Sequence, residues 1–217
     1  MSNFRYSRPN SFPPIVKNLI IINVLVWVAQ LMLDKKDGGT EWLTSKLALL
    51  PIGNGFQPYQ IATHMFTHAA YDPMGHIVLY HILFNMFGLW MFGRILENVW
   101  GGKRFLLFYL ACGVGAAAAH LLVEYLTQNY SAAVGASGAI MGIFAAFGYL
   151  FPNTELYIML IPIPVKAKWA VIGLAALDIF GGFTGGDNVA HFAHLGGALT
   201  GFILVFIWNK MDRKRFY

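Results

Sequence analysis

Five polar side chains interrupt the long apolar segments of this sequence, and they are of the types that nucleophilic catalysis uses. They are His81, Asn85, Ser137, His191 and His194. A polar side chain inside a membrane helix costs up to a few kcal/mol (about 2.5–3.5 for a charge), so it usually has a function. A serine becomes a nucleophile when an imidazole nitrogen within about 2.6–3.2 Å takes its proton. These residues therefore predict acyl transfer by a histidine-activated serine.

The composition predicts that most of the surface of the chain faces lipid. Apolar residues make up 57% of the 217 residues and charged residues 12%, about half the charged fraction of a soluble domain. Nucleic-acid binding is disfavoured, because the net charge of +5 is not gathered on a basic face with interleaved aromatic residues. The single cysteine, Cys112, excludes an intrachain disulfide.

Apolar stretches approach or reach the roughly 20 helical residues that cross a hydrocarbon core of about 30 Å. They are Ile15–Leu33, Ile77–Leu96, Phe105–Leu126, Ser137–Phe151, Trp169–Phe183 and Val189–Trp208. We expect an all-α membrane protein, a six-transmembrane-helix bundle whose long first loop, Asp34–Gly75, is semi-embedded. The expected domains are an N-terminal segment (1–14), one transmembrane domain (15–209) and a basic tail (210–217).

Basic residues predict the orientation of this bundle. If both termini lie on one side, only Lys35, Lys36 and Lys46 of the 15 lysines and arginines fall on the opposite side. Because basic residues are enriched in cytoplasmic segments, both termini are predicted to be cytoplasmic.

Three of the polar residues are predicted to lie at one depth. Each precedes by 16 residues the polar residue that marks the inner end of its own helix. The pairs are His81 and Glu97, Ser137 and Asn153, and His194 and Lys210. With a rise of 1.5 Å per residue, all three lie about 24 Å above the inner boundary.

Small residues are predicted to bring the fourth and sixth helices together. Gly138 and Gly142 on one, and Gly197 and Gly201 on the other, form small-xxx-small pairs that permit close approach in lipid. Ser137 also begins its helix, so nearby backbone N–H groups lack intrahelical acceptors and favour negative charge. Together with His81 or Asn85, these groups predict an oxyanion site.

Three segments resemble the signatures of rhomboid intramembrane serine proteases. They are His81-Ile82-Leu83-Phe84-Asn85, Gly135-Ala136-Ser137-Gly138 and Ala193-His194-Leu195-Gly196-Gly197. The resemblance covers about residues 57–205 and implies a six-helix core of the bacterial type that cleaves transmembrane proteins with a Ser–His dyad. By position, it implies Ser137 as nucleophile and His194 as base. It also implies that His81, Asn85 and the N–H of Ser137 form the oxyanion site.

The resemblance implies no metal or organic cofactor, and its implied partners are transmembrane substrates and membrane lipids, without nucleic acid. The oligomeric state stays open. Because no N-terminal extension precedes the first apolar stretch, we expect a bacterial cytoplasmic membrane rather than an organelle. Two positions depart from the family pattern: Tyr59-Gln60 stands where rhomboids commonly carry Trp-Arg, and Met141 where some carry an aromatic residue.

Four alternatives to this interpretation stay open. A catalytically inactive rhomboid-like protein would bind membrane clients, although such proteins typically lose the serine or histidine that this chain keeps. His191 is a second candidate base, nearer the outer surface. His64 and His68 have the i, i+4 spacing of metal ligands but lack a His-Glu-x-x-His motif. Asp178 invites completion of a triad but is expected to point into the aqueous cavity.

Overall fold

The computed structural model describes residues 9–34, 41–128, 131–157, 163–184 and 190–211. Its α-helices are α1 (Pro14–Leu33), α2 (Trp42–Leu47), α3 (Gln60–Thr63), α4 (Tyr80–Gly88), α5 (Arg94–Trp100), α6 (Gly102–Thr127), α7 (Ser137–Leu150), α8 (Ala167–Thr184) and α9 (His191–Met211). A 3₁₀ turn, η1 (His64–Phe66), follows α3, and a π-helical turn, η2 (Leu89–Gly93), joins α4 to α5. The short strands β1 (Glu155–Leu156) and β2 (Val165–Lys166) pair antiparallel, with Glu155 opposite Lys166.

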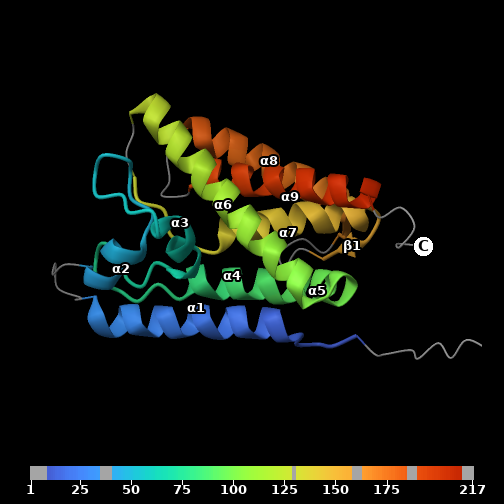
Figure 1. Cartoon of the computed structure of the whole chain (residues 1–217), viewed down its shortest axis with the longest axis horizontal. Helices are drawn as coiled ribbons and strands as arrows, with labels where there is room; N and C mark the ends of the chain where they lie inside the picture. The colour runs from blue at the N-terminus through green and yellow to red at the C-terminus, as the bar shows by residue number, and fades with distance from the viewer. Residues whose placement is uncertain (1–8, 35–40, 129–130, 158–162, 185–189, 212–217) are drawn as a thin grey trace, which may run out of the picture.

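Each predicted apolar stretch is helical over most of its described residues, and the second runs continuously through α4, η2 and α5. The helix of the second stretch begins at Tyr80, because Ile77 pairs with Tyr71 in an isolated bridge. Among the described residues, α1, α6, α8 and α9 are long and apolar enough to cross a membrane, while α7 is a shorter apolar helix. The start of α1 and the end of α9 lie at the same end of the bundle (Figure 1). The fold is thus an all-α membrane fold, and six crossings with cytoplasmic termini stay predictions. Most of the N-terminal segment and the basic tail lie outside the described residues.

Large apolar side chains cover the outside of the bundle. Met32 on α1, Phe84 on α4, Phe180 on α8 and Leu199 on α9 are all more than half exposed. Large apolar side chains exposed on so many helices are typical of a protein whose solvent is lipid.

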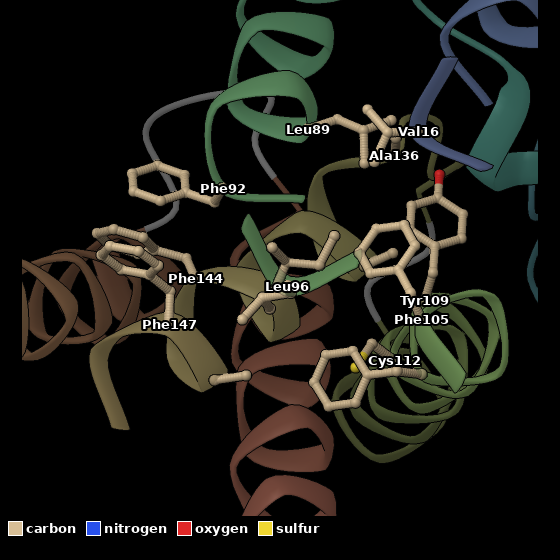
Figure 2. Close-up of a cluster of buried hydrophobic side chains, with 14 of the residues drawn as sticks. Val16, Leu89, Phe92, Leu96, Phe105, Tyr109, Cys112, Ala136, Phe144 and Phe147 are labelled. Atoms are coloured by element: carbon tan, nitrogen blue, oxygen red, sulfur yellow. The ribbon is translucent and has the colours of Figure 1, made fainter. Parts of the chain in front are cut away.

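The innermost helix is α7, which packs against α6, α8, α9 and η2 (Figure 1). The ring of Phe92 packs against Phe144 and Phe147 on α7, with its centroid 4.8 Å from that of Phe144 and 5.0 Å from that of Phe147. Figure 2 shows this cluster, which Leu96 and Phe105 continue toward α6. Because α7 is enclosed by packed side chains, the position of its first residue, Ser137, is held by the core.

The predicted small-residue pairs form the contact between α7 and α9. A methyl group at Gly197 would overlap the carbonyl oxygen of Gly138, and one at Gly201 would lie 2.5 Å from the carbonyl oxygen of Gly142. The two backbones therefore meet directly at these positions, which is the close approach that such pairs permit in membrane proteins.

The segment between α1 and α4 is tied to the entrance of α7. Leu49 and Ala133 exchange two backbone hydrogen bonds of 2.9 and 3.0 Å, and the N–H of Gly135 donates to the carbonyl of His64 at 3.0 Å. Gln60, at the Tyr59-Gln60 departure, is buried: its Oε1 accepts from the N–H groups of Leu50 and Gln57. Gln60 thus organises the loop through its amide.

Candidate active site

Ser137 and His194 meet where α7 and α9 begin. Ser137 is the first residue of α7, and its Oγ lies 2.8 Å from Nε2 of His194, one turn into α9. This distance lies within the range in which an imidazole takes a hydroxyl proton. Both residues are half-buried, so protein covers part of the pair and leaves part of it accessible. The structure therefore brings together the two residues that the sequence singled out.

The carboxylate of Asp178 extends the hydrogen-bonded pair of Ser137 and His194. This is contrary to the expectation that Asp178 points into the aqueous cavity. Asp178, on α8, is buried, and its Oδ1 lies 3.0 Å from Nδ1 of His194 and 2.8 Å from Nδ1 of His191. The expectation was wrong because α8 packs against α9, and this contact turns Asp178 toward both histidines. With one oxygen accepting from both rings, each Nδ1 carries the proton and Nε2 of His194 is left as the acceptor for the serine hydroxyl.

His191 occupies a different place from His194. Its Nε2 lies against Gly181 of α8, where an added methyl group would collide with the ring. The missing side chain at Gly181 thus makes room for His191, whose Nδ1 turns to Asp178. Of the two candidate bases, His194 is the one whose Nε2 reaches Ser137.

His81 faces the same glycine as Ser137. A Cβ at Gly135 would lie 3.0 Å from Nε2 of His81 and 3.5 Å from Oγ of Ser137. Nδ1 of His81 accepts the N–H of Ala69 at 3.2 Å, so a neutral ring carries its proton on Nε2, the nitrogen facing the site. A donor at this place, beside the N-terminal end of α7, fits the stabilisation of negative charge next to Ser137.

Asn85 lies one turn after His81 and is buried. Its Nδ2 donates to the carbonyl of His81 at 2.8 Å, which leaves one amide hydrogen for a further acceptor. Its Oδ1 has no hydrogen-bond partner within the described part of the chain. The structure places Asn85 behind His81, so its first effect is to hold this stretch of α4.

The paired loop histidines do not form a metal site with each other. Nδ1 of His64 is bound to the carbonyl of Gln60 at 2.9 Å, and the ring of His68 stands edge-on to that of His81, with centroids 5.1 Å apart. Burial lowers the pKa of His64 to about 4 and that of His68 to about 3. Both are therefore neutral, buried packing residues of the segment between α1 and α4.

The potential metal ligands lie elsewhere. Asp178, His191 and His194 offer one ligand atom each, and these atoms all lie within 4.8 Å of one another. The sequence analysis considered Asp178 as a third member of a triad and not as a metal ligand, so this cluster was not predicted. The available signal was an acidic residue near the outer end of one predicted helix and two histidines near the outer end of the next.

Fold and site define the class of the protein: an all-α membrane protein that holds a serine against a histidine. Residues 55–210 match the Rhomboid domain family, and the chain belongs to the rhomboid family.

The chain is similar to several curated relatives. The human presenilin-associated rhomboid-like protein, mitochondrial, is 35% identical over 143 residues, which are 63% of this chain and 38% of the relative. Rhomboid protein 1, mitochondrial, of Saccharomyces cerevisiae is 28% identical over 142 residues, 64% of this chain and 41% of the relative. Rhomboid-like protein 11, chloroplastic, of Arabidopsis thaliana is 35% identical over 161 residues, 70% and 53% respectively.

The matches span about a third to a half of the length of these relatives. Their names place them in mitochondria or chloroplasts, so they do not support the expected bacterial cytoplasmic membrane. Residence in a membrane agrees with the apolar helices and with the family.

Proposed function

We propose that this chain is an intramembrane serine endopeptidase, which hydrolyses peptide bonds in or near transmembrane segments of membrane proteins. The observation that carries the proposal is the 2.8 Å contact between Oγ of Ser137 and Nε2 of His194 within a membrane fold of the rhomboid family. A serine in a membrane helix usually serves packing, but a serine with an imidazole acceptor at this distance has what nucleophilic attack requires.

In the proposed reaction, Nε2 of His194 takes the hydroxyl proton as Oγ of Ser137 attacks the scissile carbonyl. The resulting imidazolium is stabilised by Asp178, which accepts its Nδ1–H and holds the ring in the required tautomer. His194 then returns the proton to the leaving amine, and an acyl-enzyme remains. A water molecule activated by the same base releases the second product.

Three hydrogen-bond donors can stabilise the negative charge of the tetrahedral intermediate. They are the backbone N–H of Ser137 at the start of α7, Nε2–H of His81 and the second amide hydrogen of Asn85. Donors held in place before the reaction lower the barrier, and loss of one such donor typically costs about 10²–10³-fold in kcat. His81 is the more direct of the two side-chain donors, since its ring faces Gly135 beside Ser137.

The experiment is cleavage of a labelled single-span membrane protein in liposomes. We expect cleavage by the wild type, none by Ser137→Ala and none by His194→Ala. Thermal unfolding curves of all three proteins should show that each is folded. A metal chelator should leave the wild-type rate intact. Cleavage that persists in Ser137→Ala would sink the proposal, and a rate abolished by the chelator would point to metal-dependent hydrolysis. Binding of the single-span protein without any cleavage would favour the inactive, client-binding alternative.

A further inference from the structure

We propose that Asp178, His191 and His194 form an inhibitory binding site for a divalent transition-metal ion such as Zn²⁺. Binding at the cluster stands on geometry alone, whereas its inhibitory effect rests on the proposed function. Two imidazoles and one carboxylate with a remaining open position are a ligand set that Zn²⁺ accepts in proteins.

The spacing of the donor atoms already approaches that of a metal site. Zinc bonds of about 2.0–2.2 Å in a tetrahedral arrangement separate neighbouring ligand atoms by roughly 3.3 Å. Oδ1 of Asp178 lies 2.8 Å from Nδ1 of His191 and 3.0 Å from Nδ1 of His194. The three ligand atoms all lie within 4.8 Å of one another. The two carboxylate–imidazole distances therefore need to change by only about half an ångström, and the imidazole–imidazole distance by at most about 1.5 Å, to admit the ion.

Packing between α8 and α9 holds the three ligand side chains in place and leaves them partly exposed. His191 and His194 lie one turn apart on α9, and the ring of His191 is seated against Gly181 of α8. The side chains of Asp178, His191 and His194 are 10, 12 and 18% exposed, respectively. A cluster so shielded keeps its geometry, while its remaining exposure admits an ion and a water molecule as fourth ligand.

Metal binding and catalysis require opposite protonation of His194. Without metal, Nδ1–H donates to Asp178, and Nε2 accepts the proton of Ser137. With metal, the lone pair of Nδ1 binds the ion, so the neutral ring carries its proton on Nε2 instead. That nitrogen then donates to Oγ and has no lone pair for the serine proton. Zn²⁺ therefore stops the reaction while Ser137 and His194 stay in place.

Inhibition is tested with the reconstituted protein and a Zn²⁺ titration, each variant being compared with its own metal-free rate. His191→Gln should raise the half-inhibitory Zn²⁺ concentration by at least about tenfold, since even outer partners of metal ligands contribute about 10–100-fold in affinity. The matched control is His76→Gln: His76 also contacts an aspartate, Asp72, at 3.0 Å, but on an exposed loop. It should leave inhibition unchanged, and Mg²⁺ should not inhibit the wild type.

Binding is tested without activity, from the absorption of Co²⁺ bound to the Ser137→Ala protein. One Co²⁺ should bind per chain, and the further change His191→Gln should remove the signal. Equal Co²⁺ binding with and without His191, or equal Zn²⁺ inhibition of wild type and His191→Gln, would overturn the inference. If the wild type cleaves nothing while Co²⁺ still binds through His191, the proposed function is contradicted and the metal site is retained.

Discussion

Gly197 of α9 lies directly against the carbonyl oxygen of Gly138 on α7, the residue after Ser137. The 2.8 Å contact between Ser137 and His194 depends on this approach, because α9 carries the imidazole three residues before Gly197. A side chain at this seam would push the two helices apart without touching either reacting group.

Gly197→Val tests this dependence. Overpacking in a tight contact costs about 1–3 kcal/mol, and a misplacement of about 1 Å can cost roughly 10²-fold in rate. We expect lowered thermal stability and a fall in kcat of that order in the liposome cleavage assay. Gly173→Ala is the matched control, because a methyl group there meets nothing within 4 Å, and it should change neither quantity appreciably. Wild-type kcat in Gly197→Val would show that the seam does not align the pair.

Gly135→Ala should impair catalysis more than stability. The backbone of Gly135 has φ of +123°, where a side chain is strained, and a methyl group would press on Nε2 of His81. We expect a kcat reduced at least about tenfold, because the donor facing the oxyanion is displaced. Gly53→Ala separates strain from collision, since Gly53 has φ of +86° and open space around it. It should cost about 1–3 kcal/mol of strain and leave kcat near wild type.

Asp178→Asn should lower kcat by roughly 10²–10⁴-fold, since an amide in this place permits the wrong tautomer of His194. KM and the unfolding temperature should stay close to wild type, because the side chain keeps its size. Steady-state cleavage and thermal unfolding of the same preparation check both expectations. If kcat stays within about twofold of wild type, a Ser–His dyad suffices and Asp178 does not act through His194.

Gln60→Ala should loosen the segment between α1 and α4. The change removes the acceptor of two N–H groups, those of Leu50 and Gln57, whose hydrogen bonds are partly buried, at a cost of about 0.5–1.5 kcal/mol each. We expect a lower unfolding temperature and faster nicking of this segment by an added protease. Gln57→Ala is the control, because the side chain of Gln57 is exposed, and its behaviour should match wild type. Equal nicking rates in the two variants would contradict the role of the Gln60 amide.

Acidification should destabilise the protein through the buried loop histidines. Burial lowers the pKa of His68 to about 3 and of His64 to about 4, below the value of about 6.5 in the unfolded chain. Between these values the unfolded chain binds more protons, so the free energy of unfolding falls as the pH falls. From pH 7.5 to pH 5 we expect a loss of about 2 kcal/mol for each histidine. In His68→Leu, thermal unfolding should depend less steeply on pH, and an unchanged slope would exclude His68 as a source.

Local pattern was enough to predict the helices, whereas the common depth of the polar layer stays a prediction. Apolar stretches of membrane-crossing length, and a spacing of 16 residues from each polar group to its inner boundary, depend only on helical rise. The small-residue pairs likewise indicated which helices approach, since glycine permits a backbone contact that a larger residue excludes. For this reason the meeting of Ser137 and His194 was predictable.

The environment of Asp178 was decided only by tertiary packing. Its orientation depends on how α8 is rotated against α9 and on the room that Gly181 leaves for His191, contacts between residues far apart in sequence. Gln60 is a second example. The sequence marks it only as a departure from the family pattern, whereas the structure shows that its amide is bonded to the backbone of Gln57 and Lys46. Sequence periodicity reports which face of a helix is apolar, whereas the partner of a buried polar group depends on the helix that packs against it.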